Sequence, residues 1–217
     1  MAATLKVGVL ISGRGSNLQA LIGACRTPGF PASIAHVLSN RADAAGLERA
    51  AAAGIPTSVL RHRDYDSREA FDAAMSQRLN EAGVELVCLA GFMRLLSDAF
   101  VATWKDRLIN IHPSLLPSFK GLGVHERVLD AGVKITGCTV HFVRAEMDSG
   151  PIIAQAAVPV DAKDTADTLA ERVLSEEHKI YPLALRLLAE GRVRVLGERA
   201  IIDGADCAEG SLINPAG

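Results

Sequence analysis

Aromatic side chains are scarce in this sequence, at 4% of its 217 residues, although apolar residues together make up 49%. The chain is long enough to bury one sizeable core, and that core should consist mainly of Ala, Val, Leu and Ile. The four cysteines form no CxxC pair and no histidine stands at zinc-finger spacing; they are Cys25, Cys88, Cys138 and Cys207. We therefore expect free thiols in a reducing compartment, and no metal site.

A strong charge of either sign is also missing, because 23 basic and 25 acidic residues leave a formal net charge of −2. This balance gives no electrostatic reason to expect a nucleic-acid or membrane partner. No apolar run reaches the roughly 20 residues of a transmembrane helix, and the first residues lack the pattern of a signal peptide. These absences predict a soluble, cytoplasmic protein.

Strand and helix patterns alternate through the first half of the chain. Strands are expected at 5–11, 33–39, 57–60, 85–90 and 108–112, with helices at 16–25, 43–53, 67–82 and 100–104. This alternation predicts an α/β fold with a doubly wound, mostly parallel twisted sheet and helices on both faces, as in Rossmann-like proteins. The second half should add antiparallel strands at 136–143 and 151–160, helices at 124–131 and 165–190, and a strand at 193–196.

No linker, repeat or low-complexity tract divides the pattern. We therefore predict a single domain over residues 1–200. Residues 201–217 are rich in Gly, Ala and Asp and are expected to form a weakly ordered tail.

The strand expected at 108–112 ends in polar residues and is broken by Pro113. Side chains alternate along a strand, so Asn110 and His112 point to the same face. A buried parallel strand should be apolar on both faces, and open α/β sheets bind ligands at the carboxyl ends of their strands. An amide can stabilise a developing oxyanion and an imidazole can move a proton near neutral pH, so the pair is a candidate catalytic centre.

A glycine-rich turn, Ser-Gly-Arg-Gly-Ser-Asn, follows the first strand at residues 12–17. Glycines let the backbone approach a ligand, and the start of the next helix offers N–H groups to an anion. Leu18 stands where a Rossmann fingerprint has its third glycine, and no Lys-Ser/Thr pair of a Walker loop follows. The residues leave two interpretations equally open: a phosphate site, or a tight turn in which Ser16 or Asn17 caps the helix.

Other polar residues have plain structural interpretations. Asp148 stands beside Ser-Gly-Pro and is typical of a turn, although a carboxylate near His112 would favour the imidazolium form. Arg94, in an apolar loop after the fourth strand, is expected in solvent or against a flat heterocycle with acidic groups. Three further sites are expected to be solvated or structural: Arg68, His141 and the pair Glu177-His178.

Four segments, in this order and at these spacings, resemble the folate-dependent formyltransferase family. They are SGRGSNLQA at 12–20, LAGFMR at 89–94, NIHPSLLP at 110–117 and DSGPII at 148–153. The third segment with the downstream Asp-x-Gly-Pro resembles folate formyltransferases as a group, and the others resemble the phosphoribosylglycinamide formyltransferase (glycinamide ribonucleotide transformylase) branch. The resemblance covers about residues 5–195, with departures at Arg14, where relatives often carry Asn, and Gly123, where they often carry His.

The resemblance implies transfer of the formyl group of 10-formyltetrahydrofolate to the amine of 5′-phosphoribosylglycinamide, in purine biosynthesis and without a metal. It implies three catalytic residues: Asn110, His112 and Asp148. The implied ligands of the ribonucleotide phosphate and glycinamide are Gly15, Ser16, Asn17 and Glu177, and those of the folate are Arg68, Met93, Arg94, Leu96 and Val143. Residues 1–105 would be the nucleotide- and phosphate-binding half, and residues 106–200 the catalytic and folate-binding half.

Competing functions differ in what else they require. A 10-formyltetrahydrofolate hydrolase would use water as the acceptor, but known hydrolases carry an extra N-terminal regulatory domain, and here the first strand starts by Leu5. Methionyl-tRNA formyltransferase would need a C-terminal RNA-binding domain and a basic surface, unlike this slightly acidic chain. A non-catalytic nucleotide-binding regulatory module would keep the glycine-rich turn but leave Asn110, His112 and Asp148 unexplained. The oligomeric state is open, and a homodimer is one alternative.

Overall fold

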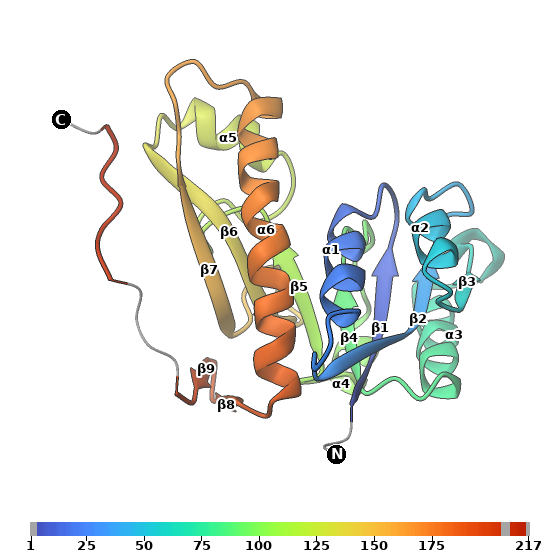
Figure 1. Cartoon of the computed structure of the whole chain (residues 1–217). Helices are drawn as coiled ribbons and strands as arrows, with labels where there is room; N and C mark the ends of the chain where they lie inside the picture. Colours follow the sequence, from blue (N-terminus) through green and yellow to red (C-terminus); the bar gives the residue numbers. More distant parts are fainter. Residues whose placement is uncertain (1–3, 205–208, 216–217) are drawn as a thin grey trace. The chain divides into compact units, whose positions relative to one another are not determined.

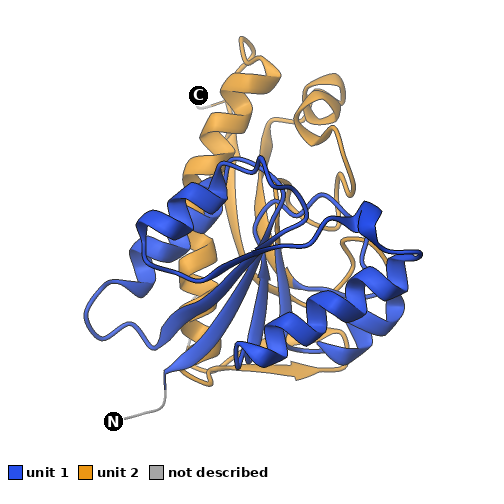
Figure 2. Cartoon of the chain, turned by 90° about the vertical axis from the view of Figure 1, so that its right-hand side faces the viewer, with its two compact units in different colours: residues 1–110, 142–145 blue, residues 111–141, 146–217 orange. Residues whose placement is uncertain are grey.

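The computed structural model describes residues 4–204 and 209–215, and its elements are labelled in Figure 1. It divides into two compact units, residues 1–110 with 142–145 and residues 111–141 with 146–217 (Figure 2). One sheet has the strand order β3-β2-β1-β4-β5-β6-β7. The predicted Rossmann-like α/β class is confirmed.

The first unit is built on parallel strands. These are β1 (Leu5–Ile11), β2 (Ala32–Ser39), β3 (Thr57–Val59), β4 (Leu86–Leu89) and most of β5 (Leu108–His112). Strand β1 pairs with β2 and β4, β2 pairs with β3, and β4 pairs with β5, all in parallel. The helices are α1 (Ser16–Cys25), α2 (Gly46–Ala52), α3 (Arg68–Glu81) and α4 (Asp98–Thr103), with the 3-10 helix η1 (His62–Asp64).

Helices cover both sides of these strands in Figure 2. On one side, helices α3 and α4 pack their apolar residues against the strands in a single core cluster. Three residues of this cluster are aromatic, and Phe71, Phe100 and Trp104 are at most 2% exposed. The rest of the cluster is mainly Leu and Val, so the predicted, mostly aliphatic core is confirmed.

The second unit contains antiparallel strands and a long helix. Its elements are α5 (Val124–Asp130), β6 (Ile135–Phe142), β7 (Ile152–Pro159), α6 (Ala166–Ala189), β8 (Val193–Leu196) and β9 (Arg199–Ile202). The predicted antiparallel pairing of β6 with β7 is confirmed, and α6 continues through Pro182.

The end of the chain differs in part from the sequence prediction. Strand β9 is not among the predicted strands; it forms an antiparallel hairpin with β8. Residues 205–208 and 216–217 of the predicted tail lie outside the described residues. Within the described part, the Asn214 side chain donates hydrogen bonds to the carbonyls of Lys134 and Val160.

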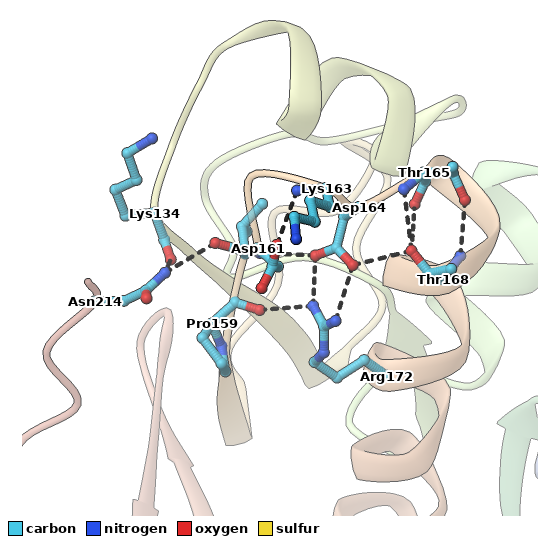
Figure 3. A network of polar contacts seen from close by, with 10 residues as sticks. Lys134, Pro159, Asp161, Lys163, Asp164, Thr165, Thr168, Arg172 and Asn214 are labelled. Carbon is cyan, nitrogen blue, oxygen red and sulfur yellow. Dashed lines mark hydrogen bonds and ion pairs between the residues drawn. The ribbon is translucent and has the colours of Figure 1, made fainter. Parts of the chain in front are cut away.

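A polar network holds the turn between β7 and α6 (Figure 3). The Arg172 guanidinium donates two hydrogen bonds to the Asp164 carboxylate, at 2.6 and 2.8 Å, and one to the Pro159 carbonyl at 2.9 Å. The Asp164 side chain is 4% exposed, and it also accepts from the Asp161 N–H and the Thr168 hydroxyl. The hydrogen bond from Arg172 is the main reason that the pKa of Asp164 lies well below its ordinary value of 3.8.

We expect Asp164→Asn to lower the free energy of unfolding by about 2 kcal/mol near neutral pH, because it weakens charge-assisted hydrogen bonds to a nearly buried group. Since the folded-state pKa is depressed, the carboxylate stabilises the fold fully above pH 3.8 and loses this effect as the pH falls below that value. Denaturant titrations of both proteins over this range should show the difference shrinking at acidic pH.

The Arg194–Asp203 pair provides a matched control. Its guanidinium also donates two hydrogen bonds to the carboxylate, at 3.0 and 2.8 Å, but its side chains are 67% and 51% exposed. Solvent screens such pairs, so Asp203→Asn should have a much smaller effect. Equal losses for Asp164→Asn and Asp203→Asn, or a difference from wild type that does not change below pH 3.8, would contradict this account.

Candidate active site

Strand β5 ends in the two polar residues that the sequence marks as candidates. Asn110 lies opposite Leu89 of β4 in the parallel register, and it is half-buried. His112 is the last residue of β5 and is 5% exposed. The predicted strand and its polar end are confirmed, so a buried imidazole stands at the carboxyl end of a parallel strand.

Both ring nitrogens of His112 face hydrogen-bond acceptors. Nδ1 lies 3.4 Å from Oδ2 of Asp148, and Nε2 lies 3.0 Å from the carbonyl oxygen of Phe119. A neutral imidazole has one N–H donor, whereas the imidazolium has two. The arrangement therefore suits a positively charged His112.

Asp148 does more than complete a turn. Its Oδ2 accepts the Gly121 backbone N–H at 2.8 Å, and its side chain is 10% exposed. Its φ of 51° is in the left-handed region, which Asp tolerates better than most residues. The turn interpretation is incomplete, because the loop after β6 brings this carboxylate to His112 at the end of β5.

His141 is a second histidine at the same carboxylate. Its Nε2 lies 3.8 Å from Oδ1 of Asp148, and the residue is 1% exposed. The sequence suggested only a structural role, because a single polar residue within an apolar strand carries no sign of its partner. The one available signal was its position at the end of β6, just before the polar loop that holds Asp148.

His125 of α5 also belongs to this neighbourhood, and no pattern in the sequence marks it as a site residue. Its Nδ1 is buried without a hydrogen-bond partner among the described residues. Burial lowers the pKa of His125, and the charge of His112 lowers it further, whereas Glu126 raises it. Burial thus favours the neutral form of His125.

Glu177 is buried in α6, which corrects its interpretation as part of a solvated surface pair. The residue is 7% exposed. It lies at helical spacing within the apolar stripe formed by Val173, Ile180, Tyr181 and Ala184, all of which are buried. The periodicity of α6 was the signal that could have identified it. Burial raises the pKa of the Cys138 thiol to about 12, and the negative charge of Glu177 contributes to this rise.

The glycine-rich turn approaches the start of α2 closely. Gly15 is the N-cap of α1, with φ 72°, and no side chain caps this helix, so the alternative of Ser16 or Asn17 as the cap is wrong. A Cβ atom added to Gly15 would lie 2.6 Å from Cα of Gly46. The Gly46 N–H donates to the Gly13 carbonyl at 3.0 Å. Helix α2 begins later than predicted, at Gly46, and the close approach of its first residue requires a glycine at position 15.

Arg49 of α2 also holds the glycine-rich turn through a hydrogen bond. Arg49 Nε donates to the Arg14 carbonyl at 3.0 Å. The turn is therefore held by hydrogen bonds to two of its carbonyls, those of residues 13 and 14. The first N–H groups of α1 lack carbonyl partners within the helix, as at every helix start, and can bind an anion.

The residues implied for folate binding lie in the first unit. Leu96 and Val143 pack against its core cluster, and the Met93 side chain is 69% exposed. Arg94 is half-buried, with its guanidinium 5.8 Å from the centre of the Phe71 ring, so it is not the fully solvated residue that the sequence suggested.

Several candidates are not brought together within one unit. Arg68 is exposed and pairs with Glu69 at 3.6 Å. The turn residues and Asn110 belong to the first unit, whereas His112, Asp148 and Glu177 belong to the second. Among residues 4–204 and 209–215, no group of three or more His, Cys, Asp or Glu side chains is arranged to hold a metal ion. No helix in the described part of the chain is long and apolar enough to cross a membrane.

Comparison with known proteins gives concordant matches. The formyl transferase family matches residues 5–185. The phosphoribosylglycinamide formyltransferase of Escherichia coli (strain K12) is 48% identical over 92% of this chain and 94% of the relative. The trifunctional purine biosynthetic protein adenosine-3 of Bos taurus is 58% identical over 91% of this chain, but the chain spans only 19% of that relative.

A solved structure agrees with these sequence matches. Glycinamide ribonucleotide transformylase 1 from Symbiobacterium toebii superposes with a TM-score of 0.90 and 53% identity, over 92% of this chain and 94% of the other. Fold, motifs and sequence identity therefore agree, and the chain belongs to the formyl transferase family.

Proposed function

We propose that this chain is a cytoplasmic phosphoribosylglycinamide formyltransferase. It transfers the formyl group of 10-formyltetrahydrofolate to the amine of 5′-phosphoribosylglycinamide, a step of purine biosynthesis. The observation that carries the proposal is His112, buried at the end of β5 with Asp148 at Nδ1 and a carbonyl at Nε2. A charged imidazole held two residues beyond an amide side chain is suited to stabilising an oxyanion.

The reaction begins when the ribonucleotide amine attacks the formyl carbon. The new C–N bond forms, and the carbonyl oxygen becomes an oxyanion in a tetrahedral intermediate. Asn110 and His112 donate hydrogen bonds to this oxyanion. Breaking the bond from the formyl carbon to the folate N10 requires a proton on N10 and the loss of one from the attacking amine. Asp148 orients His112 and passes protons through water.

His112 can turn a donor toward the substrate without leaving a buried carbonyl unpaired. The Phe119 carbonyl that faces Nε2 also accepts from the Arg127 guanidinium at 3.2 Å. When Nε2–H moves to the oxyanion, that second donor remains. The exchange therefore avoids most of the free energy penalty of an unsatisfied acceptor.

The binding roles are divided between the two substrates. The ribonucleotide phosphate binds the backbone N–H groups of Gly15, Ser16 and Asn17 and the polar side chains of Ser16 and Asn17. Glu177 contacts the glycinamide end. The folate pocket uses Met93, Arg94, Leu96 and Val143, with Arg68 near the acidic tail. Holding both substrates in attack geometry replaces much of the entropic barrier of a two-substrate reaction.

The test is release of tetrahydrofolate from 10-formyltetrahydrofolate, followed by folate absorbance with and without 5′-phosphoribosylglycinamide. Folate product that depends on the ribonucleotide supports the transferase. Product formed equally in its absence would indicate a hydrolase. Ribonucleotide binding without any turnover would indicate a non-catalytic regulatory module.

A further inference from the structure

Ser12 is a buried hydrogen-bond junction directly after β1. The residue is 6% exposed, and its hydroxyl donates to Oδ1 of Asn40 at 2.6 Å. The Ser12 hydroxyl oxygen also accepts a hydrogen bond from the backbone N–H of Met93 at 2.8 Å, and the Ser12 N–H donates to the Gly91 carbonyl at 3.1 Å. One residue thus joins the start of the glycine-rich turn, the end of β2 and the loop after β4, all within the first unit.

The two side-chain bonds of Ser12 use different capacities of one hydroxyl. A hydroxyl has a single proton to donate and two lone pairs to accept with. Because that proton is directed to Asn40, which is 7% exposed, the oxygen presents a lone pair to Met93. One rotamer of Ser12 makes both hydrogen bonds, so the position of Asn40 after β2 is linked to that of Met93 after β4.

The loop after β4 is held through hydrogen bonds to its backbone, and its side chains are exposed. Bonds from Ser12 hold it at the Gly91 carbonyl and at the Met93 N–H. The Met93 and Leu95 side chains are nevertheless 69% and 61% exposed. Such a segment suits a flat ligand, because its apolar side chains are exposed while hydrogen bonds with Ser12 hold its backbone in place.

We propose that Ser12 is a positioning residue that sets the ribonucleotide-binding turn and the folate-binding loop together. The inference rests on the proposed function, in which residues 15–17 bind the phosphate and residues 93–96 line the folate pocket. Ser12 belongs to neither set. A change at this one residue alters the affinity for both substrates.

Ser12→Ala is expected to raise the KM for each substrate on the order of ten-fold, because the part-buried Met93 N–H and the buried Asn40 amide oxygen both lose this partner. Ser16→Ala, confined to the turn, should raise only the KM for the ribonucleotide. Ser76→Ala is the matched control, since Ser76 Oγ accepts from Nε1 of the buried Trp104 at 3.1 Å in the same unit. That substitution also leaves a buried donor unpaired, yet it should leave both KM values within about two-fold.

A change in one KM alone, or in neither, would overturn the proposal for Ser12. Hydrogen exchange provides a readout that does not depend on turnover: Ser12→Ala should speed exchange in segments 13–18 and 91–96, and Ser76→Ala should not. If the wild type transfers no formyl group, the proposed function fails while exchange still tests the junction. If Ser12→Ala does not fold, Asn40→Ala breaks the 2.6 Å bond but keeps the acceptor for Met93. Asn40→Ala should then raise the ribonucleotide KM more than the folate KM. An equal rise in both KM values would count against the proposed role of Ser12.

Discussion

Asn110→Ala is expected to lower kcat by about 100- to 1000-fold, and His112→Ala by at least as much. Each substitution removes a donor that acts when negative charge develops on the formyl oxygen, so kcat should fall more than substrate binding weakens. Steady-state kinetics with both substrates varied would separate the two effects. Near-normal turnover of either variant would refute the assignment of that residue.

Two control substitutions separate catalysis from folding. His36 is also a buried histidine on a strand of the parallel sheet; it is 7% exposed, and its Nε2 lies 2.8 Å from the Ser58 hydroxyl. His36→Ala should lower the melting temperature but leave kcat within about two-fold. Asn80→Ala is the corresponding control for Asn110→Ala, because Asn80 is exposed in α3. A loss of turnover in these controls similar to that of the site variants would indicate a general effect on the fold.

Gly15→Ala is expected to have the second large effect, lowering kcat/KM for the ribonucleotide by about 100-fold. The added Cβ would lie 2.6 Å from Cα of Gly46, which is backbone and cannot rotate away. The turn must therefore move relative to α2, and the N–H groups at the start of α1 move with it. The kcat/KM for the folate should change less.

Gly54→Ala is the matched control for backbone strain. Gly54 has φ 71°, nearly the value of 72° at Gly15, but a Cβ there would meet nothing within 4 Å. Both substitutions place alanine in the left-handed region, which costs about 1 kcal/mol. Only Gly15→Ala adds the clash, so equal kcat/KM values for the two variants would show that this close approach has no role in binding.

Much of the fold could be predicted because the informative patterns are local. The alternation of apolar strands and helices along residues 5–112 determines a parallel sheet, and Pro113 after a polar strand end marks the ligand side of β5. Strand β8 was predicted, but its partner β9 was not, since this short strand at Arg199–Ile202 runs into the segment that was expected to be a weakly ordered tail.

The parts of the candidate site that the sequence did not reveal depend on contacts between distant segments. Asp148 looks like an ordinary turn residue until β6 and its loop place it beside His112 and His141. The need for glycine at residue 15 depends on residue 46, which begins another helix. Glu177 differs, because its helical spacing to Val173 and Ile180 was visible in the sequence, and burial could have been expected from it.

The most direct test of the central claim is to follow an isotopically labelled formyl carbon and oxygen from 10-formyltetrahydrofolate into product. Direct attack by the amine, through an intermediate stabilised by Asn110 and His112, predicts that both labels appear together in the formylated ribonucleotide. Label found instead in free formate, with the ribonucleotide unchanged, would contradict the account.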